Sequence, residues 1–447
     1  MTECTQKSFE FPACKRRVIE ANFEGGDITT DGGVLLLRQV DSMLGLSEAI
    51  AGVLPDPRRK ASIDHDGLSL LRQRLYALAL GYEDLNDHDQ LRQDLAIQTA
   101  VERDGALASS STLCRWENRA DRSTAWRMHE VLVDQFIASF KRAPKKLVLD
   151  FDATDDAIHG KQDGAQFHGY YDHYCFLPLY VFCKDQLLVS YLRQSQIDGA
   201  KHAWAILALL VKRLRQAWPA VKIIFRGDSG FCRWRMLSWC ERHAIGYIVG
   251  IAKNNRLNAL TARLQRDALD CYTELGTKVR WFTEFQYAAG SWDRKRHIIA
   301  KIEHTDKGSN PRYVVTNLEG KPQWLYDKLY CARGDMENRI KESQLDMFAG
   351  RTSCQRWWPN QFRLLLSSLA YVLVESIRRL ALQKTVLARA YVGTVRLKLL
   401  KIGAVIMRNT RRVRFLLASG YPYQELFFTA AARLLSLIHI SEPTRLC

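Results

Sequence analysis

The feature that most constrains the fold is a change of pattern at residues 141–146, a basic, proline-containing stretch (KRAPKK). Before it, apolar residues recur every three or four positions, as at Leu71, Leu75 and Leu78, which is typical of amphipathic helices. After it, short apolar runs bounded by turn residues follow one another, which is typical of strands. We therefore expect a helical N-terminal domain at residues 1–140, followed by an α/β domain.

The segments after this linker predict the order β-β-β-α-β-α-β. The expected strands are residues 147–152, 177–183, 186–192, 221–225 and 246–251, and the expected helices are residues 199–217 and 234–243. A mixed sheet with helices should gather its functional groups at the strand ends. The first part of this core is expected at residues 147–252.

The apolar period becomes two between residues 253 and 330, which predicts an inserted antiparallel β subdomain. Its expected strands are residues 279–287, 296–303 and 312–318. A helical pattern resumes at residues 331–358, the last helix of the core, and residues 359–434 are expected to form a basic helical C-terminal region. The final stretch, residues 435–447, contains LSLIHISEPTR and resembles the translation of a sequencing adapter, so we expect it to be a scar.

Positive charge is concentrated toward the C-terminus. The 447-residue chain has 65 Lys+Arg against 48 Asp+Glu, a formal net charge of +17. Residues 360–433 alone contain 13 Lys/Arg and 2 Asp/Glu. The arginines Arg408, Arg411, Arg412 and Arg414 lie in one short run, and like charges this dense repel unless a polyanion compensates them. The region therefore predicts a phosphate-binding surface rather than a solvated helix face.

Two arginines mark a second basic element in the N-terminal domain. A serine cluster at residues 109–111 can cap a short helix that carries Arg115 and Arg119 on its surface. Such a bundle is compatible with a DNA reader of the helix-turn-helix type. Most small helical bundles are not DNA readers, so both interpretations stay open for this segment.

Membrane and export signals are weak in this sequence. The longest apolar stretch, residues 364–374, is interrupted by two serines and falls well short of the roughly 20 residues that a spanning helix needs. The start lacks the apolar region of a signal peptide, and the 11 cysteines form no CxxC pair. We expect no membrane partner and a cytoplasmic, nucleoid-associated location.

Acidic residues mark three places where a strand ends or a helix begins. They are Asp150 and Asp152 in LDFDATDD, Asp228 in RGDSG, and Glu337 in YCARGDMENRIKE. Singly, each has an ordinary explanation as a strand end, a turn or a favourable charge in a first helical turn. Together, acids at the ends of the first and fourth strands would meet at one edge of the sheet, and a helix carrying Glu337 would complete the cluster. That geometry is ribonuclease-H-like, and it suits phosphodiester chemistry with a pair of divalent ions about 3.5–4 Å apart.

The chain resembles the DDE transposases of bacterial insertion sequences, and most closely the insertion sequence 1380 family. The resemblance covers about residues 20 to 430. The stretches that carry it are LDFDATDDAIHGKQ (149–162), HGYYDHYCFLPLYVFC (168–183), RGDSGF (226–231), YIVGIAKNNRL (247–257) and YCARGDMENRIKE (330–342).

This resemblance implies a ribonuclease-H-like core in which two aspartates and one glutamate hold two Mg²⁺ ions, with Mn²⁺ as a substitute. The family's acids map to Asp152, Asp228 and Glu337, and Asp150 competes with Asp152 for the first position. The family pattern Tyr-x2-Arg-x3-Glu-x6-Lys matches at Tyr330, Arg333 and Glu337, where the tyrosine and arginine would contact phosphate.

The family pattern is broken at position 344, which is Gln where the family has Lys. The resemblance then leaves Lys341, one helical turn earlier, as the substitute phosphate contact. It also implies an aromatic residue in the β insertion that stacks a flipped base, for which Trp292 is a candidate. A tryptophan of the core is the alternative interpretation of Trp292.

The resulting expectation is a transposase that binds the inverted repeats of its own element and hydrolyses a phosphodiester at each end. It would then join the freed 3′-hydroxyls to target DNA. The partner would be double-stranded DNA, gripped without sequence reading by the basic C-terminal helices, and two ends require a homodimer or higher oligomer. The alternatives are a ribonuclease-H-like nuclease or resolvase without strand transfer, and a DNA-binding protein whose site has decayed.

Overall fold

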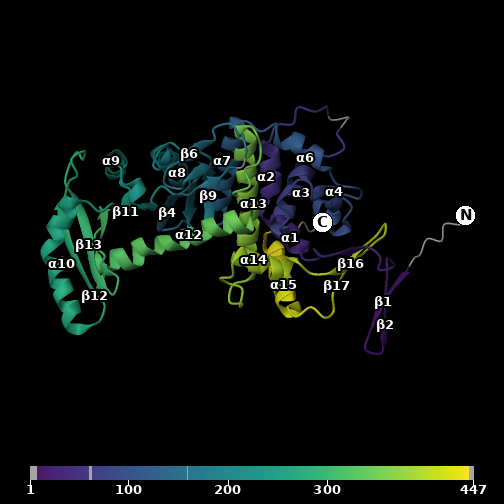
Figure 1. The fold of residues 1–447 in the computed structure, drawn as a ribbon. Coiled ribbons are helices and arrows are strands. Elements are labelled where there is room, and N and C mark those ends of the chain that lie inside the picture. Colours follow the sequence, from purple (N-terminus) through teal and green to yellow (C-terminus); the bar gives the residue numbers. More distant parts are fainter. Residues whose placement is uncertain (1–7, 60–62, 159, 442–447) are drawn as a thin grey trace, which may run out of the picture. The chain divides into compact units, whose positions relative to one another are not determined.

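The computed structural model describes residues 8–59, 63–158 and 160–441 (Figure 1). Its internal contacts divide the chain into two compact units. The terminal unit contains Met1–Trp116 and Leu373–Cys447, and the central unit contains Glu117–Val372. Within the described residues, no helix is both long enough and apolar enough to cross a bilayer.

The terminal unit is mainly helical. Its helices are α1 (Val34–Leu44), α2 (Leu46–Val53), α3 (Gly67–Leu80), α4 (His88–Leu91), α5 (Leu95–Val101), α6 (Ser110–Glu117, which ends in the central unit), the C-terminal part of α13 (Trp357–Ala381), α14 (Val392–Val395), a π-helical turn (Arg396–Leu400) and α15 (Gln424–Ser441). The stretch expected to be a scar, residues 435–447, continues α15 as far as Ser441, and residues 442–447 lie outside the described part.

Strands that the sequence did not predict lie at both ends of this unit. β1 (Ser8–Cys14) and β2 (Arg17–Asn22) form an antiparallel hairpin. β16 (Ala404–Arg408) and β17 (Val413–Leu417) form a second hairpin, which pairs with β3 (Ile28–Thr29). The prediction that residues 359–434 are helical throughout was therefore wrong for the run of dense arginines.

The turn of the second hairpin explains this difference. The backbone N–H of Asn409 donates to the Arg412 carbonyl at 3.0 Å, and the Asn409 side chain accepts from the N–H groups of Arg411 and Arg412. An asparagine that bonds its own following backbone favours a turn over a helix. The β-branched residues in the flanking strands favour pairing on either side.

The central unit is built on one mixed sheet. Its strands lie in the order β12 (Val279–Tyr287), β13 (Arg296–Thr305), β15 (Arg312–Thr316), β11 (Gly246–Ile251), β10 (Lys222–Gly227), β4 (Lys146–Ala153), β8 (Leu179–Cys183) and β9 (Gln186–Tyr191), and β14 (Gly308–Ser309) pairs with β13. β4 and β11 both pair with β10 in parallel, and the other pairs are antiparallel.

The predicted order of elements is confirmed in the first part of this unit. The chain runs β4, β8, β9, α8 (Ala203–Ala217), β10, α9 (Trp234–Arg242) and β11. The first strand lies at the centre with the fourth beside it in parallel, which is the ribonuclease-H-like arrangement. Between the first two strands, β5 (Asp156–Ala157), β6 (Gln166–His168) and β7 (His173–Phe176) form a separate small sheet in the order β5-β7-β6.

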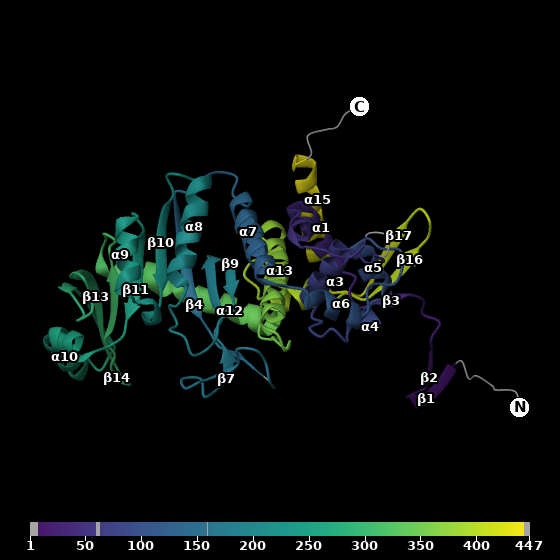
Figure 2. The ribbon, with the colours of Figure 1, turned by 90° about the horizontal axis from the view of Figure 1, so that it is seen from above.

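The insertion after β11 differs from the expected separate subdomain. It begins with a 21-residue helix, α10 (Asn255–Leu275), which packs along β13 and β12 (Figure 1; Figure 2). The strands expected at residues 279–287, 296–303 and 312–318 are present, but β15 pairs with β11 and so extends the central sheet. The free edge of β11 offers unpaired backbone groups, and the insertion satisfies them.

Helix α7 (Arg122–Ala138) also lies in a different place from that expected. Residues 1–140 were predicted to form one helical domain, yet the central unit begins at Glu117. Val133 and Phe136 of α7 belong to the apolar core under the central sheet, and His129 Nε2 lies 3.1 Å from the Ser190 carbonyl oxygen of β9. Apolar burial against the sheet therefore assigns this helix to the central unit.

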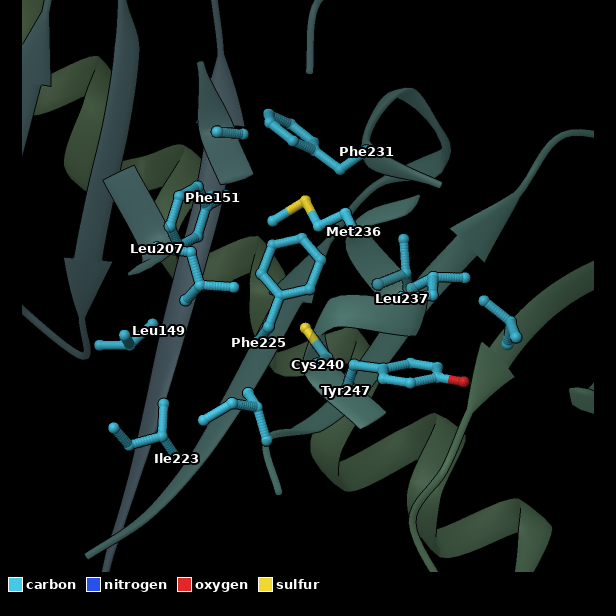
Figure 3. Close-up of a cluster of buried hydrophobic side chains, with 14 of the residues drawn as sticks. Leu149, Phe151, Leu207, Ile223, Phe225, Phe231, Met236, Leu237, Cys240 and Tyr247 are labelled. Atoms are coloured by element: carbon cyan, nitrogen blue, oxygen red, sulfur yellow. The ribbon is translucent and has the colours of Figure 1, made fainter. Parts of the chain in front are cut away.

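The two faces of the central sheet are covered by different segments. One face packs against α7, α8 and α9 in the main core, where Phe151 of β4 meets Phe225 of β10 edge-to-face at 5.2 Å, near Leu207, Phe231 and Met236 (Figure 3). The other face is covered by a continuous helical segment. That segment consists of α11 (Pro322–Trp324), a π-helical turn (Leu325–Tyr330), a 3-10 turn (Cys331–Arg333), α12 (Gly334–Lys341) and a second π-helical turn (Glu342–Asp346). Its Leu325 and Leu329 pack on Ile224 and Ile248 of the sheet.

Candidate active site

The alternation of β4 places its two aspartates on the face covered by α12 and the turns before it. Leu149 and Phe151 point into the main core, so Asp150 and Asp152 point to the opposite face. Asp228 directly follows β10, whose last residue, Gly227, is paired with Phe151. The ends of β4 and β10 therefore lie side by side, with Asp152 and Asp228 each one residue beyond this pair.

Asp150 is engaged in a buried ion pair with Arg226 of β10. Arg226 holds both carboxylate oxygens of Asp150, with Nη2 at 2.6 Å from Oδ2. The same guanidinium donates to the carbonyls of Leu329 and Ala332, in the turns that lead into α12. Only 3% of the Asp150 side chain and 8% of the Arg226 side chain are exposed. The Asp150–Arg226 pair therefore connects the sheet to the helical segment that carries Glu337.

Arg226 was not singled out from the sequence, although it stands two residues before Asp228. The signal was present, since a buried strand with an arginine at its end requires a partner for that charge. The sequence does not identify this partner as Asp150, because the pairing depends on the parallel register that sets Arg226 opposite Asp150.

Asp152 belongs to a more open group of charges. Arg333 Nη1 lies 2.9 Å from Asp152 Oδ2, and Arg333 Nη2 lies 2.5 Å from Glu337 Oε1. Arg333 precedes α12 and Glu337 lies in its first turn, so one helical turn separates them. The guanidinium thus bridges the strand acid and the helix acid.

The charges around Asp152 affect its protonation. Burial raises the pKa of Asp152 to about 6, the charges of Asp228 and Glu337 raise it as well, and Arg333 acts in the opposite direction. Asp228 at the end of β10 and Glu337 of α12 therefore lie within electrostatic reach of Asp152 on β4. A cation among these carboxylates would relieve their mutual repulsion.

This donor set suits a hard divalent cation, because carboxylate oxygens are the ligands that Mg²⁺ prefers. Within residues 8–59, 63–158 and 160–441, however, no three His, Cys, Asp or Glu side chains are gathered closely enough to hold an ion. Arg333 takes the place of a cation between two of the carboxylates. The residues fit the metal chemically, and ion binding would require the Arg333 guanidinium to move aside.

Tyr330 lies against the second acid. A Cβ atom on Gly250 of β11 would stand 2.6 Å from the Tyr330 hydroxyl oxygen and 2.9 Å from the Ser229 nitrogen. Only glycine therefore lets the tyrosine and the backbone after Asp228 approach this strand. Burial raises the pKa of Tyr330, and the charge of Asp228 raises it too.

The residue that breaks the family pattern has a local role. Gln344 Nε2 donates to the Asp155 carbonyl at 2.8 Å, three residues beyond Asp152. Lys341, the expected substitute, is exposed on the last turn of α12. The glutamine therefore braces the chain that leaves β4, and the lysine remains accessible.

The arginines that the sequence predicts to bind DNA are distant in sequence from the acidic cluster of Asp152, Asp228 and Glu337. Arg408 donates to the Gln98 side chain and the Asp104 carbonyl within the terminal unit, whereas Arg411, Arg412 and Arg414 are exposed. Arg115 lies exposed on α6 and Arg119 lies exposed just beyond it.

Trp292 is half-buried against the main core. It meets Tyr287 edge-to-face at 5.7 Å and lies under the Arg296 guanidinium. These are the contacts of a core tryptophan, the alternative that the sequence left open.

A sheet with this strand order, and with acids at the ends of its first and fourth strands and on a covering helix, defines a ribonuclease-H-like protein of the transposase type. The chain belongs to the family described as transposase DDE domain group 1, whose model matches residues 11–439. Membership implies a metal-dependent nuclease and transferase activity on DNA, and DDE transposases in general use divalent metal ions.

Among solved structures, the cryo-EM structure of the piggyBac transposase synaptic complex with hairpin DNA is similar to this chain. The two are 10% identical with a TM-score of 0.41, over 83% of this chain and 80% of that one. No curated protein matches the chain.

Proposed function

We propose that the protein is the transposase of a bacterial insertion sequence of the 1380 family. In this proposal it binds the terminal inverted repeats of its element and cleaves DNA at each end by hydrolysis of a phosphodiester. It then directs the freed 3′-hydroxyls at target DNA. The observation that supports the proposal is the Arg333 guanidinium, which bridges Asp152 of β4 and Glu337 of α12 while Asp228 follows the adjacent end of β10.

Asp152, Asp228 and Glu337 would hold the divalent ions. Bound Mg²⁺ or Mn²⁺ supplies activation of the attacking oxygen and stabilisation of the leaving oxygen. Asp152 is preferred over Asp150 as the first ligand because both Asp150 oxygens are already held by Arg226. Removing Asp150 from that buried pair would leave an unpaired guanidinium in the core.

Arg333 has two alternative binding partners in this proposal, the carboxylates of the site and a DNA phosphate. In the DNA-free protein it neutralises Asp152 and Glu337. When the carboxylates take up cations, its planar fork is freed for the phosphate beside the scissile bond, which it matches in geometry. Tyr330, held beside the backbone of Asp228, would donate its hydroxyl to the same phosphate group.

Lys341 would supply the phosphate contact that the family pattern places at position 344. Its ammonium is exposed one turn after Glu337, and a flexible lysine can reach a phosphate as a point charge. Gln344 serves the strand end instead, through the Asp155 carbonyl.

DNA outside the scissile region would be bound by the terminal unit. The exposed arginines of the β16–β17 hairpin, Arg411, Arg412 and Arg414, would contact the DNA backbone without reading sequence, beside Arg408. The N-terminal helices, with Arg115 and Arg119, would read the inverted repeats. Because two ends are cut and joined together, the active species would be a homodimer or a higher oligomer.

The test is cleavage of labelled element ends with Mg²⁺, with and without a target plasmid. Asp228→Asn should reduce cleavage on the order of 10³-fold, because one of the carboxylates that would hold the divalent ions is lost, while end binding stays within about twofold. Asp335→Asn, which removes an exposed acid two residues from Glu337, is the matched control and should cleave as the wild type does.

Each proposed activity has its own readout in this assay. Equal cleavage by Asp228→Asn and the wild type would remove the assigned role of Asp228. Cleavage without any joined donor–target product would identify a nuclease or resolvase instead. Binding of the ends without cleavage in Mg²⁺ or Mn²⁺ would identify a DNA-binding protein with a decayed site.

A further inference from the structure

The small sheet β5-β7-β6 is the part of the central unit closest in the chain to Asp152. β5 begins four residues after Asp152, and its Asp156 and Ala157 pair with Phe176 and Cys175 of β7. β6 and β7 form a hairpin in which Phe167 faces Tyr174 and His168 faces His173. The hairpin is therefore attached directly to the strand that carries the first acid.

Side-chain contacts connect the hairpin to the same place. His173 Nε2 lies 3.0 Å from Asp155 Oδ2, and the Asp155 carbonyl is held by Gln344 at 2.8 Å. Burial, together with the charges of Asp155 and Asp152, raises the pKa of Tyr171 to about 12. The ring of Tyr171 is thus within electrostatic reach of the candidate catalytic acid.

The hairpin exposes aromatic side chains both at its tip and on its strands. Tyr170 is 85% exposed, Tyr174 is 58% exposed and Phe167 is 43% exposed. Tyr170 stands nearly perpendicular to Tyr171 at 5.0 Å, so its own ring face is not stacked on that neighbour. Tyr171 also contacts His168, with ring centroids 4.9 Å apart, and His168 lies 6.5 Å from Tyr170, so the three rings form one cluster.

This arrangement fits a nucleobase better than it fits a packing role. Exposed aromatic rings on a supported element are the usual stacking partners of unpaired bases, and such stacking tolerates any sequence. In duplex DNA the base faces are covered by their neighbours, so only an unpaired or extruded base can offer one. A strand held at Asp152 for hydrolysis would present its adjacent bases to this hairpin.

We propose that the β6–β7 hairpin is a stacking platform for an unpaired nucleobase of the DNA strand beside the scissile phosphate, with Tyr170 as the stacking ring and Tyr171 as its support. This inference rests on the proposed function, since it takes the DNA strand to lie at Asp152. It places the base contact on residues 166–176 and not on the inserted strands, where Trp292 is packed against Tyr287 and Arg296.

The experiment uses the full chain and an element end with 2-aminopurine in an unpaired flank next to the cleavage position, with Ca²⁺ in place of Mg²⁺. The wild type should quench 2-aminopurine fluorescence and bind this DNA more tightly than a fully paired end. Tyr170→Ala should abolish the quenching and weaken binding of the unpaired end by about 5- to 100-fold. Binding of the fully paired end should be unchanged.

Two variants serve as controls. Tyr170→Phe keeps the ring and loses the hydroxyl, so it should quench as the wild type does. Trp204→Ala removes another exposed aromatic of the central unit, 51% exposed on α8, and should behave as the wild type. Because Tyr170 is so exposed, its replacement should leave thermal unfolding unchanged, which separates a binding defect from a folding defect.

Failure of this inference differs from failure of the proposed function. If Tyr170→Ala quenches normally while the wild type cleaves element ends, the platform is refuted and the transposase proposal stands. If the wild type cleaves no end DNA in Mg²⁺, the proposed function fails first. If Tyr170→Ala changes the oligomeric state measured by light scattering and leaves quenching intact, the hairpin contacts a second copy of the chain, and the base-stacking proposal is wrong.

Discussion

Two carboxylate–arginine groups lie two residues apart on the same face of β4, and they differ in their access to water. The Asp150–Arg226 pair is almost fully buried, with 3% and 8% of the side chains exposed. In the other group, Asp152, Arg333 and Glu337 are 15%, 18% and 47% exposed. A buried ion pair is costly to break because a lone charge stays behind, whereas a pair at the surface exchanges partners at small cost. The buried Asp150–Arg226 pair therefore stabilises the fold, whereas the more exposed group of Asp152, Arg333 and Glu337 is available to bind a ligand.

The largest expected effect is on catalysis and separates the two aspartates. Asp152→Asn should reduce Mg²⁺-dependent cleavage of element ends on the order of 10³-fold, because it removes a carboxylate that would hold the divalent ions. Its unfolding free energy should not fall, since burial already disfavours the charged form of Asp152 and the asparagine side chain is neutral. The two measurements are end cleavage and urea denaturation of the same preparation.

Asp150→Asn should show the opposite profile. It leaves Arg226 buried without its carboxylate, so the free energy of unfolding should fall by about 3–5 kcal/mol. The double variant Asp150→Leu/Arg226→Met should recover most of that loss, because an apolar pair of similar size needs no counter-charge. If Asp150→Asn unfolds like the wild type but no longer responds to Mg²⁺, the two aspartates have exchanged roles.

Arg333→Gln tests whether the open group does rearrange. Without the guanidinium, Asp152 and Glu337 lose the cation that competes with a metal ion, so Mn²⁺ should bind the DNA-free protein more tightly by about 10-fold, equivalent to roughly 1.4 kcal/mol. End cleavage should nonetheless fall by about 10- to 100-fold, because a charge-assisted phosphate contact is lost. Titration calorimetry with Mn²⁺ measures the first effect. Unchanged or weaker Mn²⁺ binding would mean that Arg333 does not occupy the place of the ion.

A third carboxylate, Asp156, is buried without an arginine partner. Its expected effect, on the pH dependence of the unfolding free energy, is the smallest of those predicted. It is 2% exposed; Thr352 donates to its Oδ2, and its Oδ1 has no hydrogen-bond partner among the described residues. Burial raises the pKa of Asp156 to about 7 from 3.8. The folded state therefore binds a proton that the unfolded state releases near pH 4, and this stabilisation is lost as the pH rises through 7.

Between pH 6 and pH 8, this single group should lower the unfolding free energy by about 1.4 kcal/mol. Asp156→Asn should remove that part of the pH dependence, because the amide does not titrate. Denaturation of both proteins at the two pH values measures the difference. An equal fall in both would show that other groups, and not Asp156, cause the pH dependence.

The sequence was sufficient for the parts of the fold that depend on local pattern. The strands at β4, β8, β9, β10 and β11 were predicted within a few residues, because each is a short apolar run between turn residues. Helix α10 was missed although its signals were present, since Asn254 caps its start and Gly276 ends it. That error was one of interpretation: the periodicity of the later strands was extended too far back.

Other features of the fold and the site depend on pairing between residues that are distant in the chain, so the sequence alone could not predict them. Asp150 and Asp152 share one face, so the sequence could not distinguish them; the distinction comes from Arg226, set opposite Asp150 by the parallel register. The joining of β15 to β11 likewise depends on which sheet edge is free. The bridging of Asp152 and Glu337 by Arg333 joins residues far apart in the chain and follows only from how the covering segment is placed.

The continuity of the central sheet has a mechanical consequence. From β9 to β12 the strands share one uninterrupted ladder of backbone hydrogen bonds, and the strands that carry or adjoin the acids are in its middle. Bending this sheet would break several backbone hydrogen bonds at once. Its outer strands and its acids are therefore expected to move together as one rigid body. If the protein joins two DNA ends as proposed, the change of shape would then fall on the DNA and on the contacts between copies of the chain, because the sheet keeps its form.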